Sequence, residues 1–156
     1  MAQARTRPGS GWLWTAAALG ALHAAVSVYW GLGGRVLRET IGQQMLQAFA
    51  GLEGLLVLVG AAKLAAAMAP AALDAAGWPL RRLTRSAAWA GAAALVLWGG
   101  ANTVVGNLVL AEVIVPDGGH DRPAMIGHAW LWDPLFLAWG GCLIVGLLRS
   151  RRARAR

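Results

Sequence analysis

The sequence predicts an all-α integral membrane protein, a four-helix bundle with both termini in the cytoplasm. Three observations predict it: four long apolar stretches, very little charge within them, and an uneven distribution of arginine between them. The chain has 156 residues, of which 58% are hydrophobic and 13% are charged. A soluble protein of this length would expose far more charge, so the apolar excess indicates a surface that faces lipid. We expect one domain over residues 1–156.

The apolar stretches have the length that a membrane-spanning helix needs. A hydrocarbon layer about 30 Å thick is crossed by about 20 helical residues. The predicted spans are Leu13–Leu32, Met45–Ala69, Ala87–Ala111 and Ala124–Leu148. Residues that favour turns follow them, and Pro70 is expected to close the second span.

The arginines predict the orientation of the spans. Ten of them lie before the first span, between the second and third spans, or after the fourth, whereas the other two loops hold three. The positive-inside rule therefore assigns both termini and the middle loop to the cytoplasm. Thirteen arginines against one lysine are typical of a GC-rich bacterial genome, so we expect a bacterial inner membrane. The apolar run of the first span continues through Val26–Trp30, which argues against a cleaved signal peptide.

The composition also excludes several classes of function. The net charge of +7 arises at the ends of the spans, so we expect no nucleic-acid partner. Cys142 is the only cysteine, which excludes an internal disulfide and a cysteine-rich metal site. His23 and His128 are separated by about 15 Å of helical rise, too far apart to ligate one haem. We expect no metal and no cofactor.

Ionisable residues inside the spans are the first functional candidates, because a charge in hydrocarbon is costly. His23 and Glu53 are predicted near the middle of the first and second spans, at similar depth. They form either a proton-accepting or ligand-orienting pair, or a structural hydrogen bond between helices. Lys63 is expected to extend its long side chain to the cytoplasmic headgroups.

A second group of polar residues is predicted in the outer half of the bundle. Its members are Tyr29, Asn102, Asn107, His128 and Asp133. Pro134 follows Asp133, and residues 134–148 alone are too short to span the membrane. The last helix therefore either begins near Pro123 and kinks at Pro134, or begins within the membrane with Asp133 as its cap, and both arrangements leave backbone groups that need partners. Together these residues predict a polar cavity that opens outward, although interhelical hydrogen bonds also explain the asparagines.

Two motifs resemble a known family. The first span reads His23-Ala-Ala-Val-Ser-Val-Tyr29-Trp30-Gly-Leu-Gly-Gly, and the last contains Trp-Asp133-Pro134-Leu. This pattern resembles domain-of-unknown-function family 3995, small bacterial membrane proteins with His followed by Tyr-Trp-Ala-Leu-Gly-Gly in the first helix and Tyr-Ser-Pro-Leu in the last. Here glycine replaces the alanine, and Trp-Asp replaces Tyr-Ser. The resemblance covers almost the whole chain and implies a four-helix membrane domain, but no reaction.

The spacing within the first motif has a physical meaning of its own. His23 and Trp30 are two helical turns apart, so they share a face of the helix. Tyr29 and Trp30 either contact a ligand or anchor the helix at the membrane interface, where aromatic rings accumulate.

These observations favour a protein that is not an enzyme and that binds a lipid-like or apolar ligand, or a partner helix, in the outward pocket. Tyr29, Glu53, Asn102, His128 and Asp133 are expected to line that pocket. One alternative is a proton-coupled exporter of small hydrophobic cations, in which Glu53 holds either a proton or the cation. Another is a membrane-embedded enzyme with His23 and Glu53 as acid and base. The expected partners are membrane lipid and either a second copy of the chain or another membrane protein.

Overall fold

The computed structural model of the chain describes residues 8–152 and consists there of helices and their connections. Four helical segments are long and apolar enough to cross a membrane. They are α1 (Ser10–Gly31), α3 (Leu55–Ala75), α4 (Arg81–Leu110) and the continuous run from Arg122 to Ser150. The last run comprises α5 (Arg122–Gly127), a π-helical turn (His128–Trp132) and α6 (Asp133–Arg152). The predicted all-α membrane protein with four spans is therefore confirmed.

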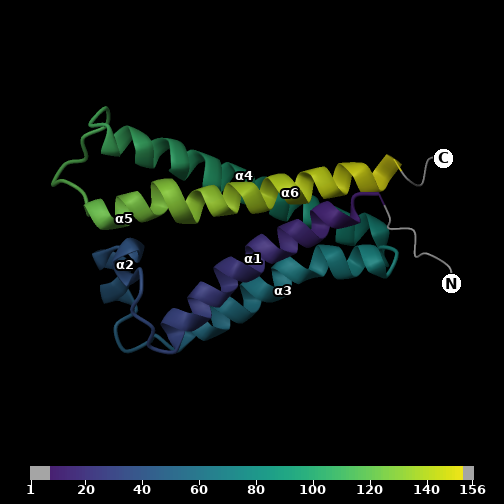
Figure 1. The fold of residues 1–156 in the computed structure, drawn as a ribbon, viewed down its shortest axis with the longest axis horizontal. Helices are drawn as coiled ribbons and strands as arrows, with labels where there is room; N and C mark the ends of the chain where they lie inside the picture. The colour runs from purple at the N-terminus through teal and green to yellow at the C-terminus, as the bar shows by residue number, and fades with distance from the viewer. Residues whose placement is uncertain (1–7, 153–156) are drawn as a thin grey trace.

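The helices form two pairs, α1 with α3 and α4 with α6, and the pairs are joined by packing of α1 on α6. Figure 1 shows that the pairs converge at one end and diverge at the other. Residues 32–54, which we call the connecting segment, lie at the open end. This segment contains a 3-10 turn (Arg38–Ile41) and the short helix α2 (Gln43–Ala48).

Small side chains allow the helices to approach closely at the converging end. Alanines make up about half of the buried core there, which comprises Leu13, Ala16, Ala17, Ala67, Ala71, Trp78, Ala88, Ala92, Trp139, Leu143 and Leu147. Small residues favour helix association in lipid, because they let the backbones come into contact. The many alanines of the sequence therefore explain the tight packing of the converging end.

Arg85 reinforces this end. The buried Arg85 guanidinium donates to the carbonyl oxygen of Leu147 at 2.6 Å and to Ser150 Oγ at 3.0 Å. It also lies 4.9 Å from the centre of the Trp78 ring. Arg85 is therefore more than the topology signal expected from its charge, because it ties the start of α4 to the end of α6.

The same end contains the start of α1, the end of α6 and the turn between α3 and α4 (Figure 1). A Cβ atom on Gly9, just before α1, would lie 2.7 Å from the Gly146 carbonyl oxygen of α6. This arrangement agrees with the even number of crossings that the charge pattern requires. The cytoplasmic location of this end stays a prediction from the positive-inside rule. The outermost arginines of both tails lie outside the described residues.

The predicted bounds of the second span, Met45–Ala69, are wrong. The apolar run from residue 45 is interrupted at Gly51, whose φ of +78° is incompatible with a continuing α-helix. The spanning helix starts at Leu55 and continues past Pro70 to Ala75. Pro70 does not close the helix because a proline removes only one backbone hydrogen bond, a loss that membrane helices tolerate when a neighbouring helix covers the site.

The fourth span begins at Arg122 and is continuous through Pro134. The Asp121 side chain accepts a hydrogen bond from the Ala124 backbone amide and caps α5. Of the two arrangements considered for Pro134, the structure has the earlier start. The π-helical turn directly before Asp133 changes the hydrogen-bond register where Pro134 lacks an N–H group.

We expect Gly99→Ala to destabilise the protein by about 1–3 kcal/mol through overpacking. A Cβ atom on Gly99 would lie 2.6 Å from the Asp133 carbonyl oxygen and from the Leu137 amide nitrogen. Its matched control is Gly91→Ala in the same helix, where a Cβ atom meets nothing within 4 Å. Unfolding in mixed detergent micelles measures both, and equal stability of the two variants would contradict the close packing of α4 on α6.

Candidate functional site

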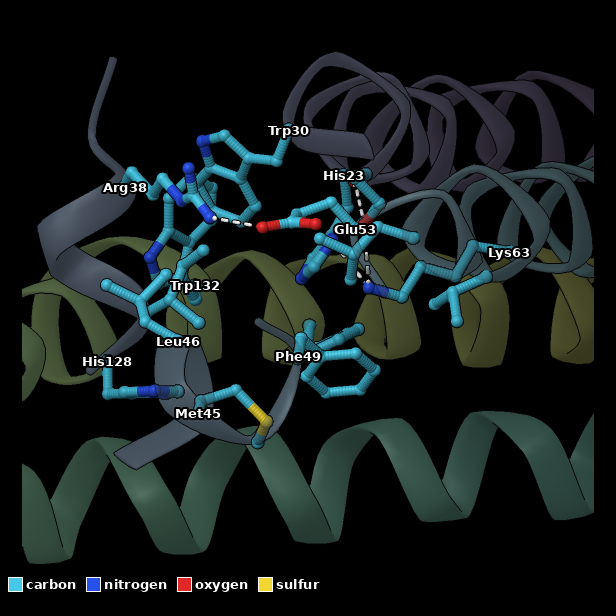
Figure 2. Close-up of a pocket in the computed structure, with 15 residues that line it drawn as sticks. His23, Trp30, Arg38, Met45, Leu46, Phe49, Glu53, Lys63, His128 and Trp132 are labelled. Atoms are coloured by element: carbon cyan, nitrogen blue, oxygen red, sulfur yellow. Dashed lines mark hydrogen bonds and ion pairs between the residues drawn. The ribbon is translucent and has the colours of Figure 1, made fainter. Parts of the chain in front are cut away.

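A cavity of about 270 Å³ lies between the diverging helix pairs, beneath the connecting segment. Figure 2 shows residues from α1, α3, the connecting segment and the α5–α6 run around it. Its apolar wall is formed by Trp30, Ile41, Met45, Leu46, Phe49, Leu56, Val59, Trp132 and Phe136. Its polar lining is formed by His23, Ser27, Arg38, Glu53, Lys63 and His128.

One polar group of the cavity, Lys63, joins α3 to α1. Lys63 Nζ lies 3.3 Å from His23 Nδ1 and 3.0 Å from Ser27 Oγ (Figure 2). The same nitrogen is 5.9 Å from the centre of the Phe136 ring. The prediction that Lys63 extends to the cytoplasmic headgroups is wrong, because its ammonium group contacts His23 and Ser27 on the neighbouring helix α1 instead.

The contact with Lys63 determines which ring nitrogen of His23 carries the proton. An ammonium group is only a donor, so Nδ1 accepts and the neutral ring is protonated at Nε2. The ring stacks on Phe136 at 4.2 Å and lies 5.8 Å from the Trp132 ring. Nε2 is buried and has no hydrogen-bond partner among the described residues, and the same is true of Asp133 Oδ1. One donor and one acceptor therefore remain unsatisfied where α1 packs on the fourth span.

Asp133 is held by His128 across the π-helical turn. His128 Nδ1 lies 3.0 Å from Asp133 Oδ2, and the Asp133 side chain is 1% exposed whereas that of His128 is 47% exposed. A buried carboxylate needs such a partner, because an unpaired buried charge is strongly destabilising. His128 therefore connects Asp133 to the rim of the cavity.

Glu53 lies in the turn before α3 and not in the middle of a span. Its Oε1 is 3.3 Å from Arg38 Nη2, and both side chains are about one third exposed. Hydrogen bonding to its own backbone amide and to that of Gly51, then the interaction with Arg38, holds the pKa of the Glu53 carboxyl below its ordinary value. Glu53 is thus an ion-paired carboxylate at the edge of the cavity.

Indole nitrogens and the Asp121 side chain fix the connecting segment over the opening. Trp30 Nε1 donates to the Val36 carbonyl oxygen, and Trp132 Nε1 donates to Thr40 Oγ1, both at 2.9 Å. The backbone amide of Gln43 donates to Asp121 Oδ2 at 2.9 Å. Because these bonds reach both helix pairs, the connecting segment bridges the open end of the molecule.

The structure brings half of the predicted site residues together. His23, Trp30, Glu53 and His128 line the cavity, whereas Tyr29, Asn102, Asn107 and Asp133 do not. The Tyr29 hydroxyl accepts hydrogen bonds from the Arg35 and Val36 amides. Asn107 accepts from Trp130 Nε1, which joins α4 to the fourth span. Asn102 lies half-buried on α4, away from the cavity.

His23 and Glu53 line the same cavity but bond to different partners. Lys63 is the partner of His23, and Arg38 is the partner of Glu53. The predicted depth of Glu53 is wrong because the second span starts later than expected. Sequence reasoning missed Ser27 and Lys63 as site residues. Ser27 lies one turn after His23, and Lys63 is the only lysine of the chain, so both had a detectable signal.

Among residues 8–152, no three His, Cys, Asp or Glu side chains come close enough to hold a metal ion. The side chains that line the cavity are instead suited to binding by charge, hydrogen bonding and apolar contact.

Comparison with protein families identifies the chain. A family model described as protein of unknown function (DUF3995) matches residues 19–143. The chain belongs to this family. The match runs from α1, before His23, into α6, beyond Phe136, and so contains every residue that lines the cavity of this DUF3995 protein. No curated protein and no solved structure matched the chain.

We expect His128→Ala to destabilise the protein by about 1–3 kcal/mol, because it leaves a buried carboxylate oxygen without its partner. Asp133→Asn in the His128→Ala background removes the unpaired buried charge. The double variant should therefore lose less stability than the sum of the losses in His128→Ala and in Asp133→Asn alone. Unfolding of the four proteins in the same mixed micelles measures the coupling. Purely additive losses would contradict a direct His128–Asp133 interaction.

Proposed function

We propose that this membrane protein binds an amphiphilic, lipid-like molecule in the cavity between its helix pairs. The observation that carries the proposal is the composition of the wall. Aromatic and aliphatic side chains form most of it, and a small set of polar groups, which includes the buried His23 and Ser27, completes the lining. This combination is typical of small-molecule sites, where apolar contact supplies affinity and a few polar groups fix orientation.

The size of the cavity favours a slender ligand. A volume of about 270 Å³ is near the lower end of ligand pockets, which occupy about 300–1,000 Å³. An apolar cavity of about 150 Å³ accommodates benzene. One acyl chain therefore suits this space better than the two chains of a phospholipid.

The observations favour binding over the two alternatives. Exchange of a proton for a cation requires a buried carboxylate without a fixed partner, and Glu53 is partly exposed and paired with Arg38. An acid and a base must exchange protons with a substrate, and here each group is already engaged: His23 Nδ1 contacts Lys63, and Glu53 is paired with Arg38.

The location in the membrane is part of the proposal. Residues of the connecting segment line the cavity, and this segment lies at the end opposite the start of α1, the end of α6 and the arginine-rich turn between α3 and α4 (Figure 1). In a bacterial inner membrane, the positive-inside rule places that end on the outer side. A ligand then enters from the outer leaflet or from the periplasm.

We expect native mass spectrometry of the gently extracted protein to detect a retained amphiphile. Val59→Trp fills the cavity from α3 and should reduce the retained fraction by about tenfold, equivalent to about 1.4 kcal/mol of binding free energy. The matched control is Leu58→Trp, because Leu58 is the adjacent residue of α3, is 66% exposed and does not line the cavity.

Two outcomes would contradict the proposal. The wild-type protein retains no molecule beyond loosely bound detergent and lipid, or both tryptophan variants retain as much as the wild type. The same spectra report the subunit count, which tests the separate prediction of a homodimer or of a partner membrane protein.

A further inference from the structure

The charged side chains around the cavity leave one positive charge without a counter-ion. Arg38, Glu53 and Lys63 line the cavity, and the first two form an ion pair with each other. Among the described residues, no carboxylate lies within 4.0 Å of Lys63 Nζ, whose hydrogen-bond partners are His23 and Ser27. The carboxylate of Asp133 is bonded to His128 and does not line the cavity. The end of the cavity at Lys63 is therefore electropositive.

Lys63 also has a donor to spare. An ammonium group has three N–H donors, and His23 Nδ1 and Ser27 Oγ accept two of them. Ser27 Oγ itself donates to the His23 carbonyl oxygen, so the two acceptors are fixed on α1. The third N–H remains for a ligand, and the Phe136 ring supplies a further weak contact for the cation.

A cation in this position is costly unless an anion joins it. Transfer of an unpaired charge from water into an apolar environment is strongly unfavourable, and intramembrane lysines normally have partners. Charge complementarity therefore identifies the missing counter-ion as a group carried by the ligand. The apolar wall of Leu56, Val59 and Phe49 extends from this point and suits a hydrocarbon chain.

We propose that the ligand is a single-chain amphiphile with a singly charged anionic oxygen headgroup, and that this headgroup pairs with Lys63. The inference rests on the proposed function and adds the chemical class of the ligand. Two sources carry such a headgroup: the carboxylate of a free fatty acid and the phosphodiester of a lysophospholipid. His23 and Ser27 act here as positioning residues, because they hold the ammonium group and need not contact the ligand.

The test compares ligands that have the same chain and different headgroup charge. The full-length protein is placed in nanodiscs of phosphatidylcholine, and binding of tritiated palmitate and tritiated hexadecanol is measured at pH 8. We expect the wild type to bind palmitate at least about tenfold more tightly than hexadecanol. In Lys63→Met, hexadecanol should still bind and the ratio of the two affinities should fall to about one.

A matched variant controls for loss of positive charge elsewhere. Arg35→Met removes an exposed cation of the connecting segment that does not line the cavity, and the preference for palmitate should persist. Competition with lysophosphatidylglycerol identifies the source: displacement of palmitate supports an anion site that accepts a phosphodiester, and no displacement supports one restricted to a carboxylate.

The outcomes separate this inference from the proposed function. Equal binding of palmitate and hexadecanol to the wild type, or an unchanged preference in Lys63→Met, would overturn the anion site while leaving a cavity that binds amphiphiles. Binding of neither compound to the wild type would overturn both proposals. The wild-type comparison stands even if the Lys63 variant fails to fold.

Discussion

The structure depends on one constraint: the two helix pairs pack tightly at one end only. Alanines and glycines let the backbones meet at the converging end, where Arg85 also ties α4 to α6. At the other end, the bulky side chains of Trp30, Trp132 and Phe136 lie between the pairs. These side chains form part of the cavity wall, so the cavity lies where the two pairs diverge.

The connecting segment covers part of that opening and lines the cavity. It forms hydrogen bonds with Trp30 of α1 and with Trp132 and Asp121 of the fourth span. The segment therefore bridges the two helix pairs where they diverge. Arg38 of the same segment forms an ion pair with Glu53. As a result, the Glu53 carboxylate at the cavity is paired, whereas the Lys63 ammonium group has no carboxylate partner among residues 8–152. The fold thereby produces an amphiphilic site from mostly apolar helices.

The sequence predicted the helices far better than their contacts. Length, hydropathy and arginine placement identified four spans, because lipid imposes those features on any membrane helix. The start of the second span was missed because residues 45–52 are as apolar as a span, and only the backbone turn at Gly51 excludes them. That error placed Glu53 too deep and paired it with His23. Helix rotation decides which side chains meet, and hydropathy contains no information about it, so the partnership of Lys63 with His23 required the structure.

The most direct test of the central claim is the position of a bound chain. A crystal structure of the protein with a fatty acid brominated near the middle of its chain locates the bromine by its anomalous signal. We expect a bromine peak inside the cavity, between Val59 and Phe136, with the carboxylate beside Lys63. Bromine found only on the outer, lipid-facing surfaces of the helices, with the connecting segment filling the cavity, would contradict it.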